Sequence, residues 1–209
     1  MALIKLAFVL REQSRESDAA ALHEESFALL DELVREAPRD GEIAGMWIAT
    51  LAHGAVEDWE AGRVEGVGER LELAESEARA LLERDPYHGT PMFAQVLDWR
   101  AWWCLKNGRP DTAGALYQEA LEHLETALAA DEHNQRMLYL ASKIAFNLAM
   151  RANGAGRYEE AGTFLERAWQ HIDWVADAFP EIARYEEHRN RVGSRLPAVA
   201  ERGEGASDE

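Results

Sequence analysis

Several kinds of residue and pattern are scarce in this chain of 209 residues. It has one cysteine, Cys104, so no disulfide can form within the chain, and this favours a reducing compartment. Basic residues number 22 against 39 acidic ones, a formal net charge of -17 that repels nucleic acid and anionic membranes. No stretch reaches the roughly 18 apolar residues that a membrane span needs. The sequence therefore predicts a cytoplasmic protein that binds neither nucleic acid nor membrane.

The N-terminus has an apolar run, Met1–Leu10, that could be read as a secretion signal. Lys5 interrupts the run, and Arg11, Glu12 and Arg15 follow where a small-residue cleavage site should lie. We expect a first amphipathic helix there rather than a signal peptide.

A Gly-Arg dipeptide recurs along the chain at nearly constant intervals. It occurs as Gly62-Arg63, Gly108-Arg109 and Gly156-Arg157, and the glycines are 46 and 48 residues apart (108 − 62 and 156 − 108). One interval earlier the same place holds Ser14-Arg15. A fixed period of this kind is typical of stacked helical or solenoid repeats, so the sequence predicts four units.

Small residues occupy fixed positions on both sides of each dipeptide. Seven residues before it stand Ala7, Ala55, Ala101 and Ala149, and twelve after it stand Ser26, Ala74, Ala120 and Ala168. Small side chains let two helices cross closely. A glycine suits the end of the first helix, and a proline 24 residues later ends the second in three of the four units, at Pro38, Pro86 and Pro180. Each unit is predicted to be a helical hairpin.

The expected fold is therefore all-α, with no segment showing the period-two alternation of a strand. We expect helices near residues 2–12, 17–36, 42–60, 66–84, 91–106, 110–130, 135–153, 158–178 and 181–194. The last carries Arg184, Arg189 and Arg191 and would cap the stack with a polar face. Residues 1–194 form the predicted repeat domain, and 195–209 form a disordered acidic tail.

The second half of the chain resembles the tetratricopeptide repeat family. Gly156-Arg157-Tyr158-Glu159-Glu160-Ala161, followed by Leu165 and Ala168, is similar to that family's Gly-x-Tyr-x-x-Ala pattern, and Gly108, Ala113, Tyr117 and Ala120 match it as well. The resemblance implies an α-α superhelix, a solenoid of about four helical hairpins with a C-terminal capping helix. The period here exceeds the family's usual length of about 34 residues, so each helix would be longer by about two turns.

In proteins of that family the first helix of each hairpin lines a concave groove. The resemblance places an unusually apolar set of residues there, with a few polar ones: Phe8, Val56, Trp59, Asp98, Trp102, Leu105, Lys106, Lys143, Phe146, Met150 and Asn153. Extended apolar surface of this kind usually marks a binding or self-association site.

Motifs for catalysis or for cofactors are not found. The seven histidines show no metal-protease or di-iron spacing, and the pair of His53 with Glu57 is read as a surface pair. Cys104 is read as a buried structural thiol, and none of the Gly-Arg copies continues as a phosphate-binding loop. We therefore expect no metal and no cofactor, and nothing in the sequence requires an enzymatic activity.

Three functional hypotheses remain. The leading one is a scaffold that binds a protein or peptide of apolar or cationic character in its groove. The second is an enzyme or small-molecule receptor with a pocket near Trp99–Trp103, beside His53, Asp98 and Arg100. The third is a homodimer joined through the apolar face or the first helix.

Overall fold

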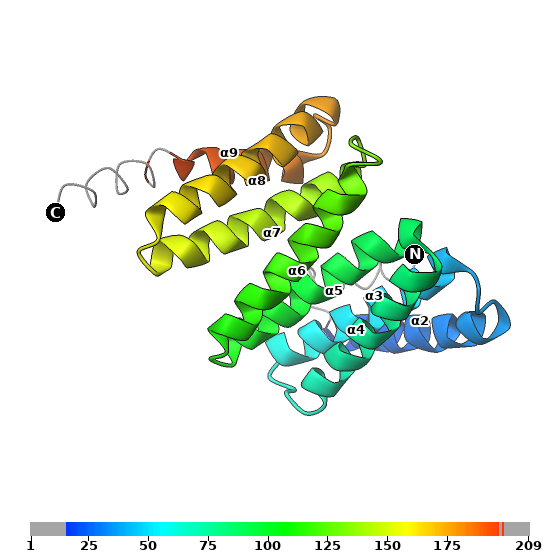
Figure 1. Ribbon diagram of the computed structural model, residues 1–209. Coiled ribbons are helices and arrows are strands. Elements are labelled where there is room, and N and C mark those ends of the chain that lie inside the picture. The colour runs from blue at the N-terminus through cyan, green and yellow to red at the C-terminus, as the bar shows by residue number, and fades with distance from the viewer. Residues whose placement is uncertain (1–15, 197, 199–209) are drawn as a thin grey trace. The chain divides into compact units, whose positions relative to one another are not determined.

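The computed structural model describes residues 16–196 and 198. Those residues contain helices and no strand, and Figure 1 shows the helices in chain order. Their bounds are α2 (Glu16–Glu36), α3 (Gly41–Glu60), α4 (Val67–Arg84), α5 (Pro86–Lys106), α6 (Pro110–Leu128), α7 (Gln135–Gly154), α8 (Tyr158–Ala178) and α9 (Ala183–Gly193). The chain divides into two compact units inside α5, between Arg100 and Ala101.

In the first unit, α3 packs against both α2 and α4. Asp40 starts α3, because its Oδ1 accepts hydrogen bonds of 3.0 Å from the backbone N–H groups of Glu42 and Ile43, which have no partner within the helix. The apolar faces of these helices form the core, where Ile48 and Leu71 are almost completely buried. The first part of α5 adds Phe93 to the same set of buried side chains.

In the second unit, α7 is the central helix and packs against α6 and α8. Asn134 starts it by accepting the backbone N–H of Met137 at 3.1 Å. The final helix, α9, packs against α8 and also contacts α7 (Figure 1). The apolar stripe of α8, which includes Leu165 and Ile172, is fully buried.

The three Gly-Arg dipeptides form the same turn. Each glycine has a positive φ, 78° at Gly62, 69° at Gly108 and 75° at Gly156, where a side chain would be strained. In every copy the glycine N–H bonds the carbonyl three residues back at 3.0–3.2 Å. The arginine N–H bonds the carbonyl five residues back at 2.7–2.9 Å. This is the Schellman helix end, and it joins α3 to α4, α5 to α6 and α7 to α8.

The small-residue columns also have the predicted role. The members that the structure describes on the first helices are fully buried, namely Ala55, Ala101 and Ala149, and so are their counterparts Ala74, Ala120 and Ala168. Ser26 on α2 is buried as well. The prediction of an all-α fold built from helical hairpins is therefore confirmed for the described residues.

Seven predicted helices agree with the structure to within two residues at either end, and α5 is the exception. It begins at Pro86, five residues before the predicted start, because proline suits the first turn of a helix and Pro91 is accommodated inside. The predicted helix at 2–12 and most of the predicted tail, residues 197 and 199–209, lie outside the described residues. At the start of that tail, residues 196 and 198 are helical. None of the described helices is long and apolar enough to cross a membrane.

Candidate functional site

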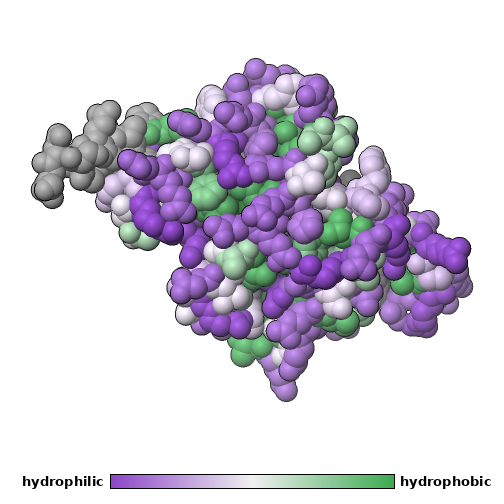
Figure 2. Space-filling view, viewed as in Figure 1, coloured by the Kyte–Doolittle hydropathy of each residue, from purple (hydrophilic) through white to green (hydrophobic). Residues whose placement is uncertain are grey.

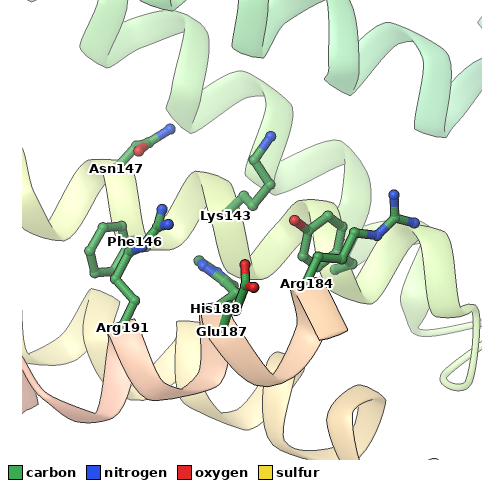
Figure 3. A pocket seen from close by; sticks show the side chains of 8 residues that line it. Lys143, Phe146, Asn147, Arg184, Glu187, His188 and Arg191 are labelled. Atoms are coloured by element: carbon green, nitrogen blue, oxygen red, sulfur yellow. The ribbon is translucent and has the colours of Figure 1, made fainter. Parts of the chain in front are cut away.

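A cleft opens in the second unit between α7 and α9. Its volume is about 110 Å³, and Figure 3 shows the side chains that line it. Four of the lining residues come from α7, namely Tyr139, Lys143, Phe146 and Asn147, and four come from α9, namely Arg184, Glu187, His188 and Arg191. This is the site where aromatic, cationic and buried polar groups meet.

Helical periodicity brings these residues to the cleft. Tyr139, Lys143 and Phe146 follow one another at intervals of four and three residues, so they share one face of α7. On α9, Arg184, His188 and Arg191 have the same spacing. Figure 3 shows the two arginines at opposite ends of the row, with His188 between them.

The floor of the cleft includes the ring of His188, which contacts the fully buried Ser142. The Ser142 hydroxyl donates to the backbone carbonyl of Ala168 on α8 at 2.7 Å, and Oγ lies 3.0 Å from His188 Nε2. Ser142 has no exposed surface and His188 is 5% exposed. The imidazole also packs edge-on against the rings of Tyr139 and Phe146, each with its centroid 5.8 Å away. His188 thereby ties the last helix to α7.

These contacts fix the state of the His188 ring. The only hydrogen of the Ser142 hydroxyl goes to Ala168, so Oγ acts as the acceptor and Nε2 of His188 carries the proton. Burial, against a hydrogen bond with the Ser142 backbone that raises it and together with the charges of Arg191 and Lys143, lowers the pKa of His188 from 6.5 to about 4. The imidazole is therefore neutral near pH 7.

A serine beside a histidine also suggests a nucleophile and its base. That role requires a hydroxyl that substrate can reach and whose proton the histidine accepts. Ser142 is fully buried, and its proton is held by a backbone carbonyl. The pair satisfies buried polar atoms and has the geometry of a structural contact.

The charges around the cleft differ from those of the chain as a whole. Three cationic side chains, Lys143, Arg184 and Arg191, line it with a single carboxylate, Glu187. Arg189, on the same helix, instead pairs with Asp173, Asp177 and Glu186 at 2.5–3.4 Å. Hydrogen bonds to Asp177 and Glu186 raise its pKa.

Arg184 and Arg191 show no ion pair with any described carboxylate. The Arg184 guanidinium lies over the rings of Tyr139 and Tyr185 instead, at 5.3 and 5.1 Å from their centroids. The cleft is therefore a locally basic, aromatic surface on an acidic protein.

The structure places the predicted groove residues in several environments. Lys143 and Phe146 line the cleft, and Met150 and Asn153 continue along α7 as half-buried residues. Five others lie elsewhere on α3 and α5, where Val56, Trp59 and Trp102 are half-buried and Leu105 and Lys106 are exposed. Asp98 is buried, and its Oδ2 accepts a 3.3 Å hydrogen bond from Gln95. Phe8 lies outside the described residues.

The tryptophans of α5 each pack against a different neighbour. The ring centroids of Trp99 and His53 are 5.9 Å apart. The Lys106 ammonium lies 5.8 Å from the Trp102 ring centroid, and the Arg109 guanidinium lies 4.5 Å from the Trp103 ring centroid. On the face that Figure 2 shows, small hydrophobic areas lie among mainly hydrophilic side chains.

Two further expectations can be compared with the structure. Cys104 is buried, as predicted, and His53 Nδ1 pairs with the Glu57 carboxylate at 3.1 Å on the protein surface. Within the described part of the chain, no three histidine, cysteine or acidic side chains gather in a metal-binding arrangement.

Comparisons with known proteins address the fold. No family model and no curated protein matches the chain. Among solved structures, BtubC (BKLC) from P. vanneervenii superposes with a TM-score of 0.60 at 16% identity, over 86% of this chain and 71% of that one. The protein has an all-helical repeat fold.

A second similar structure is a circular tandem repeat protein with a novel repeat topology and enhanced subunit contact surfaces. It has a TM-score of 0.35 and 16% identity, and the match covers 98% of this chain and 59% of that one. At these identities the likeness concerns the fold and carries no activity or partner to this chain.

Sequence reasoning missed most of the α9 side of the cleft. Arg184 and Arg191 were expected on a solvated capping face, and His188 was not singled out. The sequence does contain a signal for this side of the cleft. A histidine with one arginine four residues before it and another three residues after it is unusual in a chain dominated by carboxylates. The Ser142 partner lies 46 residues away, so only the packed structure shows the pair.

Proposed function

We propose that this protein is a binding scaffold of the tetratricopeptide-like kind, which holds a protein or peptide partner at the α7–α9 cleft. The observation that carries the proposal is the cleft itself, where aromatic rings and three cationic side chains surround a buried neutral histidine. Rings supply contact area at low entropic cost, and cations supply directional hydrogen bonds. Together they suit recognition of a flexible segment.

The neighbouring surface of α7 supports the same function. Lys143, Phe146, Met150 and Asn153 lie at intervals of three and four residues, so they follow one face of the helix, and all are half-buried. A partner that enters the cleft could continue along this face. These four residues belong to the groove that the sequence predicts.

Site-specific photocrosslinking tests the proposal. A photoreactive amino acid at Asn147, which lines the cleft, should capture a discrete partner from extract of the native cell. The matched control carries the same group at Glu159, an exposed residue at the start of α8. We expect Phe146→Ala to reduce the Asn147 adduct by about tenfold, since a buried aromatic anchor commonly contributes more than 1 kcal/mol to an interface.

Equal capture from both positions would contradict the proposal. So would an Asn147 adduct that Phe146→Ala leaves unchanged. Circular dichroism of each variant distinguishes a lost contact from a lost fold.

A further inference from the structure

Two arginines on α9 define the geometry of the cleft. Arg184 and Arg191 are seven residues apart on one helix, which places their Cα atoms about 10 Å apart along the axis. Both are exposed, and Figure 3 shows them at the two ends of the cleft. They do not converge on one point, so they are better placed to hold two separate anions than a single phosphate.

Several arginines elsewhere in the described chain already pair with carboxylates, unlike these two. In this acidic chain, Arg63 pairs with Asp58, Arg100 with Glu75 and Arg167 with Glu125. Arg184 and Arg191 have Glu187 one turn away on their own helix, yet no ion pair with it is present. Arg184 donates one hydrogen bond to the Tyr185 hydroxyl at 3.3 Å, and its other N–H groups and those of Arg191 remain available to carboxylates from another molecule.

The size of the cleft limits what can enter it. A cavity of about 110 Å³ is somewhat smaller than the roughly 150 Å³ that accommodates a single benzene ring. One side chain fits such a space, and a whole helix does not. The ligand therefore lies across the opening and inserts a single side chain.

We propose that the cleft binds an extended acidic peptide in which two carboxylates three residues apart contact Arg184 and Arg191. A peptide in the extended polyproline II conformation advances about 9 Å over three residues and has three residues per turn. Side chains three residues apart therefore lie on the same side, at close to the separation of the two arginine Cα atoms. Lys143, from α7, adds a third positive charge on the other wall. This inference rests on the proposed function and specifies the chemistry of its ligand.

The floor of the cleft determines which kind of side chain fits between the two carboxylates. His188 is uncharged near pH 7, and the ring of Phe146 lies beside it. A charged side chain would find no partner on this floor. An apolar or aromatic residue between the two acids fits it.

Short labelled peptides test the spacing directly. The probe contains Glu-Ala-Phe-Glu, and an isomer of the same composition contains Glu-Glu-Phe-Ala, in which the carboxylates are adjacent and Phe no longer lies between them. In fluorescence anisotropy with the full chain, we expect the first to bind roughly tenfold more tightly than the isomer, because one charge-assisted contact is lost. Equal affinities would overturn the spacing argument.

Variants of the protein test the two arginines. We expect Arg184→Gln and Arg191→Gln each to weaken binding of Glu-Ala-Phe-Glu by about tenfold, and increasing salt to weaken it further. Arg157→Gln removes the same charge from an exposed arginine in the α7–α8 turn and should change affinity by less than about twofold. Equal loss in all three variants would show a response to net charge alone and would overturn the proposal.

Two other anionic ligands are tested as alternatives to the acidic peptide. Vesicles containing phosphatidylserine and single-stranded DNA are tested with the same variants. Tighter binding of either one, lost in Arg184→Gln and Arg191→Gln, would overturn the peptide assignment. If the Asn147 crosslink persists while the acidic peptides fail, the scaffold function stands and the acidic ligand is wrong.

Discussion

Protonation of His188 should destabilise the folded protein in a defined pH range. Burial lowers the pKa of this imidazole to about 4, against 6.5 for an ordinary histidine, so the unfolded chain binds the proton more readily. The stabilisation is complete above about pH 6.5 and is lost as the pH falls toward 4. Between pH 7 and pH 5 the difference in proton binding lowers the free energy of unfolding by about 2 kcal/mol.

Burial outweighs the one favourable interaction, a hydrogen bond with the Ser142 backbone that raises the pKa of His188. Arg191 on α9 and Lys143 on α7 both disfavour the imidazolium, and the Ser142 hydroxyl and the Ala168 carbonyl are already hydrogen-bonded to each other. Glu187, a carboxylate in the same cleft, is exposed.

Urea denaturation followed by circular dichroism, repeated from pH 7.5 to pH 5, measures the effect. The matched variant is His188→Phe, which keeps a ring between Tyr139 and Phe146 and cannot be protonated. We expect the variant to lack about 2 kcal/mol of the pH dependence that the parent shows. The other histidines contribute equally to both proteins and cancel in the difference.

If the free energy of unfolding changes with pH in the same way for both proteins, the reasoning is refuted. That result would mean that His188 binds protons as readily in the folded state as in the unfolded one. Nuclear magnetic resonance gives an independent check. The ring C–H signals of His188 should titrate near pH 4 in the folded protein.

Three further predictions concern stability and are measured by the same denaturation assay at pH 7. Ser142→Ala should cost about 1–3 kcal/mol, because it leaves the buried Nε2–H of His188 without its acceptor, and a neutral result would contradict the hydrogen-bond assignment. Gly156→Ala should cost about 1–2 kcal/mol at its φ of 75°, whereas Gly154→Ala, with open space around it inside α7, should be neutral or stabilising. Leu165→Ala should cost about 2–5 kcal/mol, since the side chain is fully buried, and a loss below 1 kcal/mol would argue against that packing.

The fold could be predicted from the sequence because its determinants are local. The residues that end a helix and those that let two helices cross closely lie at fixed distances along the chain, as Gly108 and Ala101 do. A glycine at the helix end requires no knowledge of distant packing. The start of α5 was wrong by five residues because a proline inside a helix can be tolerated, as Pro91 is, and the sequence pattern alone does not show this.

The candidate site was only partly predictable. The α7 face was found through helical register, which gave Lys143 and Phe146. The α9 face was missed because its importance depends on a contact between helices, the hydrogen bond from His188 to Ser142. Whether an arginine is paired also depends on geometry, as the contrast between Arg189 and Arg191 shows on one short helix.

Main-chain hydrogen bonds close the three Gly-Arg turns, so the connection between the helices does not depend on the arginine side chains. The arginine side chains contact a different group in each copy: Arg63 pairs with Asp58, Arg109 covers Trp103 and Arg157 pairs with Glu160. Since no side chain is needed to hold the turn, it can serve as a joint for recombination. A segment that runs from one Gly-Arg turn to the next, inserted at a third such turn, would keep its own surface side chains. The α6–α7 segment, which lies between the Gly108 and Gly156 turns and carries the α7 half of the cleft, is thus a natural module for grafting.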